Sequence, residues 1–294
     1  MTANGKYGLH GVSGDGAAAF EALARAELVV TDCDGTLLYT DKALGEPAKD
    51  AVRRLREVGV RFTVASSRPG RGMRQSWRRW QWTCLTRRTT AAAWFSRARG
   101  RCSRRASCRA TSCRRRSKRS PPRASTHGCS STMPWYLTHP DATYVPLETR
   151  TVGYEGVLVK RFDDVDLDAV DKIVGSTADT ALLARVEIGL QTQLEGRGHA
   201  ARSQAYYLDV TNLEANKGTA VRELAHLANV PLERVAVLGD MGNDMAMFEI
   251  AGVSIAMGQA SETVRHSASL VSKSNDEDGF AIGVNALLAA RSDR

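Results

Sequence analysis

Asp32 and Asp34 are the residues whose types and spacing most directly suggest chemistry in this sequence. They follow the apolar run 28–30 and precede Gly35 and Thr36. The run predicts a buried strand ending in a turn, and carboxylates two positions apart on extended chain point to one side. A divalent cation relieves their mutual repulsion, and hard oxygen ligands suit Mg²⁺. An Asp-rich turn without a metal is the alternative for this pair taken alone.

A second acidic group follows the apolar run 235–238 and Gly239. Asp240 ends this predicted strand, and Asp244 comes four residues later, on the first turn of a helix, with Asn243 beside it. Asp240 can therefore bind a metal directly, while Asp244 and Asn243 brace it, and the Asn243 amide can also reach a phosphate. A cluster of helix-capping residues is the alternative.

Ser66 and Lys217 occupy comparable places. Ser66 ends the predicted strand 60–65, where its hydroxyl could reach a phosphoryl oxygen held at the tip of a neighbouring parallel strand. A serine in this place is otherwise a turn former. Lys217 begins a predicted helix, where a lysine is either solvated or directed at an anion.

The elements that must position these residues predict an α/β fold. A helix from Pro47 to Val58, ended by Gly59, links strands 28–32 and 60–65 as the crossover of a βαβ unit. We therefore expect a doubly wound, Rossmann-like parallel sheet whose carboxyl edge holds the site. A short helix is expected at 17–25, in a leader formed by residues 1–25.

The order of these motifs resembles the haloacid dehalogenase-like (HAD) phosphatases of the Cof type, subfamily IIB. Asp-Cys-Asp-Gly-Thr-Leu-Leu at 32–38 is similar to the first motif of that family, and Gly-Asp-Met-Gly-Asn-Asp at 239–244 to the last. Ser66 aligns with the threonine of Ala-Thr-Gly-Arg, and Ser67 replaces the glycine. The resemblance covers about residues 27–70 and 142–290.

The resemblance implies a Mg²⁺-dependent phosphomonoester hydrolase that works through an aspartyl-phosphate. Asp32 would attack phosphorus, and Asp34 would protonate the leaving oxygen and then activate water. Mg²⁺ would be held by Asp32, the Asp34 carbonyl and Asp240, and Asp244 would support it. The phosphate would be held by Ser66, Lys217 and Asn243. The partner would be a small phosphorylated metabolite such as a sugar phosphate or a phosphorylated cofactor.

The resemblance also implies an inserted α+β cap domain. We expect core segments at 26–72 and 203–294 and a partly degraded cap at 73–202. Periodicity predicts one cap helix, at 166–174. It predicts strands at 144–147, 153–162, 182–188 and 204–210.

Residues 73–133 do not read as ordinary protein sequence. Residues 71–140 hold 17 arginines and one lysine but no acidic residue, so the net charge of +9 originates there. We interpret 73–133 as a wrong reading frame closed by a second shift, which would remove the strand and Asn-Gly loop that Cof-type enzymes carry. A basic nucleic-acid-binding insert is a less favoured alternative. A zinc site is weaker still, because the cysteines form no CxxC pair.

Length and hydropathy limit the remaining possibilities. A chain of 294 residues can form two domains, and no run of about 18 apolar residues predicts a membrane span. Without a signal-peptide pattern, a cytoplasmic enzyme is expected. A catalytically impaired HAD-like protein is the alternative, and the sequence leaves the oligomeric state open.

Overall fold

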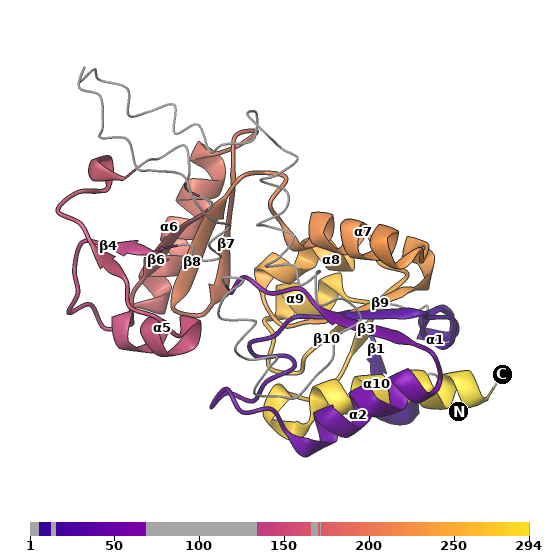
Figure 1. The fold of residues 1–294 in the computed structure, drawn as a ribbon. Helices are drawn as coiled ribbons and strands as arrows, with labels where there is room; N and C mark the ends of the chain where they lie inside the picture. Colours follow the sequence, from indigo (N-terminus) through magenta and orange to yellow (C-terminus); the bar gives the residue numbers. More distant parts are fainter. Residues whose placement is uncertain (1–5, 13–15, 69–133, 166–169, 171, 294) are drawn as a thin grey trace.

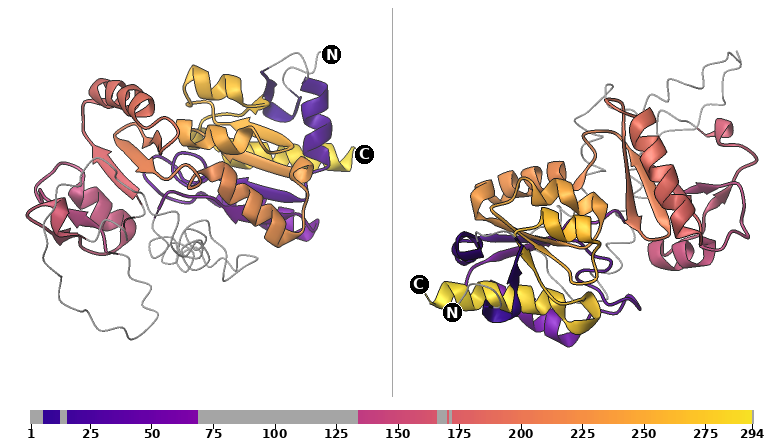
Figure 2. Two further views of the ribbon diagram at one scale, coloured as in Figure 1. Left: turned by 90° about the horizontal axis from the view of Figure 1, so that it is seen from above. Right: turned by 180° about the vertical axis from the view of Figure 1, so that it is seen from behind.

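The computed structural model describes residues 6–12, 16–68, 134–165, 170 and 172–293. They form two parts, which we call the core, residues up to 68 and from 212, and the insert, residues 134–211 (Figure 1). The insert lies beside the core, on the side opposite the C-terminal end of helix α10 (Gly279–Ser292) (Figure 2).

A six-stranded sheet forms the centre of the core, in the order β1-β11-β10-β9-β2-β3. All neighbouring strands run parallel except β1, which is antiparallel to β11. Its central strands are buried along their whole length because helices cover both faces of the sheet. The strands are β1 (His10–Gly11), β2 (Leu28–Thr31), β3 (Arg61–Val64), β9 (Val235–Gly239), β10 (Val253–Ala256) and β11 (Leu270–Val271).

Two layers of helices enclose this sheet, with α2 and α10 on one face and α7, α8 and α9 on the other (Figure 1). Each layer packs its apolar residues into a separate buried cluster against the sheet. The cluster on the α2 and α10 face also includes α1. The helices are α1 (Gly16–Ala24), α2 (Glu46–Glu57), α7 (Lys217–Ala228), α8 (Met245–Phe248), α9 (Glu262–Ser267) and α10 (Gly279–Ser292).

The insert has a smaller, mostly antiparallel architecture. A three-stranded sheet in the order β6-β8-β7 packs against α6, and β4 and β5 form a short parallel pair. The insert elements are β4 (Tyr136–Leu137), α5 (Val145–Val152), β5 (Val157–Leu158), β6 (Lys172–Ser176), α6 (Thr180–Gln193), β7 (His199–Gln204) and β8 (Tyr207–Thr211).

The core confirms the expected α/β doubly wound fold and the elements predicted within it. The strand expected at 28–32 is β2, and the crossover helix is α2, which has Pro47 in its first turn. Gly59 follows with φ +75, a left-handed conformation that ends the helix. The helix expected at 17–25 is α1.

Three predictions for the insert were wrong. The expected strand 144–147 is the start of α5, with proline in its first turn, and the expected strand 182–188 lies within α6. Asp179 caps α6 by accepting a hydrogen bond from the backbone of Leu182, at 2.8 Å. Of the expected helix 166–174, residues 172–174 belong to strand β6, and 166–169 and 171 lie outside the described residues.

The other expectations for this region have mixed outcomes. Only 157–158 of the expected strand 153–162 form a strand, and 204–210 spans the turn between β7 and β8. The three-stranded sheet of the insert includes β7 and runs to Thr211 in β8, so the expected domain boundary after residue 202 falls inside β7. Residues 73–133, which we interpret as out-of-frame and lacking a strand, lie outside the described residues. Residues 1–5 and 13–15 of the expected leader also lie outside them. Among the described residues, no helix is long and apolar enough to cross a membrane.

Candidate active site

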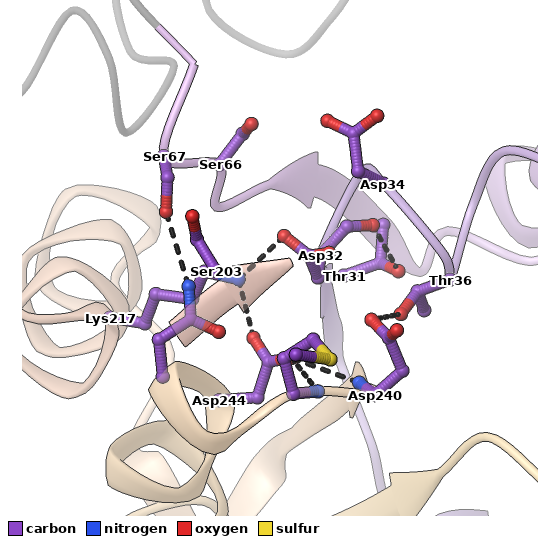
Figure 3. Close-up of polar contacts among 12 residues, drawn as sticks. Thr31, Asp32, Asp34, Thr36, Ser66, Ser67, Ser203, Lys217, Asp240 and Asp244 are labelled. Carbon is purple, nitrogen blue, oxygen red and sulfur yellow. Dashed lines mark hydrogen bonds and ion pairs between the residues drawn. The ribbon is translucent and has the colours of Figure 1, made fainter. Parts of the chain in front are cut away.

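Asp32, Asp244 and Lys217 form a buried charge cluster at the carboxyl edge of the core sheet (Figure 3). Asp32 directly follows β2, and Lys217 begins α7 just after the insert. The Lys217 Nζ lies 2.5 Å from an oxygen of Asp32 and 2.5 Å from an oxygen of Asp244. The other Asp244 oxygen accepts hydrogen bonds from the backbone N–H groups of Asp240 and Met241, each at 2.9 Å. Asp244 therefore fixes the β9–α8 turn.

Asp240 completes the cluster from the tip of β9. Its Oδ1 accepts a hydrogen bond from the Thr36 hydroxyl at 3.0 Å, which joins the two motif turns (Figure 3). Gly35 has φ +86, and a Cβ there would lie 2.4 Å from Asp240 Oδ2. Only glycine therefore permits this approach.

The charges of the cluster are tuned by burial and by one another. Burial, together with the charge of Asp244, raises the pKa of Asp32 to about 7, although Lys217 opposes the shift. Burial and the charges of Asp32 and Asp244 also raise the pKa of Asp240 well above its ordinary value. Burial alone would lower the pKa of Lys217, but the carboxylates of Asp244 and Asp32 outweigh it and raise that pKa.

This donor set fits a hard divalent cation. Asp32, Asp240 and Asp244 each offer one carboxylate oxygen, and these oxygens lie within 4.8 Å of one another. A cation beside Asp32 and Asp240 would favour their charged forms, which burial and the nearby carboxylates disfavour. All the ligand atoms are oxygens, as Mg²⁺ prefers. The cluster could therefore hold a metal ion.

Asp34 stands apart from this cluster, and its side chain points away from Asp32 and Asp240 (Figure 3). Arg68 donates two hydrogen bonds to the Asp34 carboxylate. Its Nε donates to Oδ2 at 2.6 Å, and its Nη2 donates to Oδ1 at 2.5 Å. Lys42 Nζ lies 3.0 Å from Oδ1. Burial alone would raise the pKa of Asp34, but Arg68 and Lys42 together lower it. Asp34 is therefore held as a carboxylate.

Ser66 and Asn243 lie on the same edge of the sheet. Ser66 is buried after β3, and its hydroxyl accepts a hydrogen bond from the Arg68 backbone N–H at 3.1 Å. The Asn243 amide donates to the Ser67 hydroxyl at 3.2 Å, while its Oδ1 is buried with no hydrogen-bond partner within the described part of the chain. These groups border a pocket that the insert closes from the other side.

All seven residues expected at the site lie at this one edge of the core, but Asp34 is turned toward the pocket rather than the carboxylate cluster. Arg68 and Lys42 had not been assigned roles. Arg68 occupies the arginine position of Ala-Thr-Gly-Arg, so the motif itself carried that signal. Lys42 lies in a loop, where no local pattern predicts that it reaches Asp34.

Comparison with known proteins identifies the family of this chain. The sequence matches the haloacid dehalogenase-like hydrolase family over residues 29–86 and 129–283, well over half of the chain. The chain belongs to this family. The matched ranges omit residues 87–128.

Two curated relatives of this HAD chain are phosphatases of Bacillus subtilis. Phosphatase YwpJ is 40% identical over 86 residues, which cover 29% of this chain and 30% of YwpJ. The 5-amino-6-(5-phospho-D-ribitylamino)uracil phosphatase YwtE is 33% identical over 89 residues, which cover 30% of this chain and 31% of YwtE. The chain spans about half the length, or less, of the curated relatives it matches.

Solved structures share the HAD fold over most of the chain. A haloacid dehalogenase-like hydrolase from Bacteroides thetaiotaomicron superposes with a TM-score of 0.59 at 22% identity. The superposition covers 88% of this chain and 98% of that one. The likeness extends across both core and insert and supports the expected arrangement of a Rossmann-like core with a cap.

Proposed function

We propose that this HAD protein is a Mg²⁺-dependent phosphomonoester hydrolase that forms a phosphoryl intermediate on Asp32. The observation that carries the proposal is the buried convergence of Asp32, Asp240, Asp244 and Lys217. The phosphatase relatives support the same reaction class.

Asp32 is the proposed nucleophile because its carboxylate lies at the centre of the charge cluster. One oxygen attacks phosphorus, an aspartyl-phosphate bond forms and the bond to the leaving oxygen breaks. Lys217 holds Asp32 in place and offers a fixed positive charge to the phosphoryl oxygens. The charge that develops during transfer therefore meets a preorganised cation.

Asp34 is the proposed acid and base. In the first step its proton passes to the leaving oxygen, and in the second it takes a proton from the water that attacks phosphorus and releases phosphate. The pairing with Arg68 and Lys42 suits the second step, in which Asp34 must be a carboxylate. We infer that the incoming phosphate dianion draws these cations away from Asp34, which lets it carry a proton in the first step.

The remaining residues would hold the phosphate and the cation. Ser66 and the Asn243 amide would donate to the phosphoryl oxygens, and Asp32, the Asp34 carbonyl and Asp240 would hold Mg²⁺, with Asp244 in support. When bound, Mg²⁺ supplies positive charge that offsets the negative charge of the phosphoryl group. The name of YwtE specifies a phosphorylated small metabolite, and we propose a partner of that class here.

The test is Mg²⁺-dependent release of phosphate from p-nitrophenyl phosphate by the full chain. We expect turnover that a chelator abolishes and that added Mg²⁺ restores. Asp32→Asn should remove it, whereas Asp50→Asn, at an exposed position on α2, should not. Circular dichroism would establish that each variant is folded. A folded but inactive wild-type chain would contradict the proposal and point to a catalytically impaired protein.

A further inference from the structure

The pocket between core and insert has two chemically different walls. The core wall carries Asp32, Asp34 and Arg68, the groups assigned to phosphoryl transfer. The insert wall carries residues without a role in that chemistry, from α5, β6, β7, β8 and the turn between the last two. The charged, amide and aromatic members of the insert wall are Glu148, Lys172, Gln204, Tyr206, Tyr207 and Asp209.

Asp209 is the exceptional residue of the insert wall. It is only 8% exposed, and its Oδ2 accepts a hydrogen bond from Lys172 Nζ at 3.0 Å. Its Oδ1 is buried with no partner among the described residues. A buried carboxylate oxygen without a donor is costly, because the desolvation of that oxygen is uncompensated. A ligand that supplies a donor would remove this cost.

Lys172 fixes where that oxygen lies relative to the core. Besides Asp209, its Nζ donates to the backbone oxygen of Ser67 at 3.2 Å, in the loop that carries Ser66. The pair is therefore tied to the core edge where the phosphate would bind. Asp209 lines the same pocket as Asp32 and Asp34, so a leaving group held in that pocket can contact it.

The remaining members of the insert wall favour a neutral leaving group with hydroxyls. Glu148 and Asp209 place two acids beside Lys172 on the insert wall, while Lys42 and Arg68 on the core wall pair with Asp34. A second anionic group on the insert wall would therefore meet more acidic than basic side chains. The ring of Tyr206 stacks on that of Tyr144 at a centroid distance of 4.5 Å, and Tyr207 packs edge-on against Tyr206. These rings add uncharged aromatic surface to the insert wall.

We propose that Asp209, positioned by Lys172, selects the leaving group by accepting a hydrogen bond from one of its hydroxyls. This inference rests on the proposed phosphatase function. It adds a specificity residue from the insert to a site whose chemistry lies in the core. A site built to accept a hydroxyl disfavours an analogue that lacks one, because the buried oxygen is then left unpaired.

The test compares esters with and without leaving-group hydroxyls. We would measure kcat/KM of the full chain for glucose 6-phosphate, ribose 5-phosphate and p-nitrophenyl phosphate, with Asp209→Asn beside wild type. The loss of kcat/KM for the sugar esters should exceed that for the aryl ester by about tenfold or more. Asp163→Asn, at an exposed position on the insert, is the matched control and should leave kcat/KM unchanged for the sugar esters and for the aryl ester. Equal losses on all esters would overturn the inference.

A binding measurement separates this inference from the catalytic proposal. In the Asp32→Asn background, which cannot turn over, calorimetry gives the Kd of glucose 6-phosphate with and without Asp209→Asn. We expect the second substitution to weaken binding about tenfold. An unchanged Kd would overturn the role of Asp209 even if the wild type is active. Tenfold weaker binding in a chain with no turnover would support that role and contradict only the proposed catalysis.

Discussion

The core and the insert bury their apolar residues to very different extents. In the core, two extensive clusters enclose the sheet, and residues such as Leu55 and Val237 are fully buried. In the insert, one small cluster is centred on Leu183, Ala200 and Leu208. Most exposed large apolar residues of the described chain belong to the insert, including Leu158 at 60% and Ile188 at 65% exposed.

This difference separates the tasks of the two parts. The charged cluster around Asp32 needs a rigid, water-poor setting, which the doubly covered sheet provides. The insert contributes a wall to the pocket through a few polar contacts, such as that from Gln204 to the Asp34 carbonyl at 3.3 Å. We therefore expect changes in the core to affect catalysis and global stability, and changes in the insert to affect substrate choice and local stability.

The largest expected effect is on catalysis, from Lys217→Met. The substitution removes the cation between Asp32 and Asp244, so kcat should fall about a hundredfold to a thousandfold for every ester. Steady-state assays with aryl and sugar phosphates measure this loss. Lys49→Met, at a partly exposed lysine of α2, is the control. A loss confined to sugar esters would contradict the division between the two parts.

A matched pair of truncations compares the stability of core and insert. Leu55→Ala removes a fully buried side chain of α2 and should lower the free energy of unfolding by about 2–5 kcal/mol. Leu182→Ala trims an insert side chain that is 42% exposed and should change it by less than about 0.5 kcal/mol. Urea denaturation measures both. Similar losses would show that the two parts are packed alike.

Arg68→Gln tests how Asp34 is positioned. Without the two guanidinium contacts the carboxylate is free to move, so kcat should fall on the order of tenfold to a hundredfold while KM changes less. Arg68→Lys should restore little of the lost kcat, because an ammonium group cannot donate the two parallel hydrogen bonds that the guanidinium makes to Asp34. Steady-state kinetics with p-nitrophenyl phosphate as the substrate measures kcat and KM of both variants. A rise in KM with kcat unchanged would contradict the positioning role and leave Arg68 only the contact with the incoming phosphate.

Two helix caps are expected to have small effects that differ in how far they extend through the chain. Asp179 caps α6 in the insert, and Asn216 caps α7 in the core by accepting from the Thr219 N–H at 2.9 Å. Replacing either with alanine should cost about 1 kcal/mol. Hydrogen exchange should show that Asn216→Ala lowers global protection, whereas Asp179→Ala lowers protection only within α6. Global destabilisation by Asp179→Ala would mean that the insert unfolds together with the core.

The same contrast explains what the sequence could predict. Strands such as 28–31 and 235–239 are buried on both faces, so a continuous apolar run marks them without ambiguity. The motif turns follow directly, and the site residues on them converge in the structure. The roles given to those residues remain predictions.

The insert could not be predicted in this way because its elements are only partly buried. Leu183 is buried, but Val186 and Ile188 beside it are exposed, so the β-branched residues suggested a strand where a capped helix forms. Lys172 fell in an expected helix, and its pairing with Asp209 depends on the register of β6 against β8. Sequence spacing alone does not carry that register.

The most direct test of the central claim is to locate the phosphoryl group on the chain. The wild-type protein would be mixed with Mg²⁺ and p-nitrophenyl phosphate, quenched in acid within milliseconds and digested for mass spectrometry. We predict phosphorylation on Asp32, in the peptide that also contains Asp34, and none in Asp32→Asn. Phosphate release without any phosphorylated peptide, or a phosphoryl group on another residue, would contradict the assignment of Asp32 as the nucleophile.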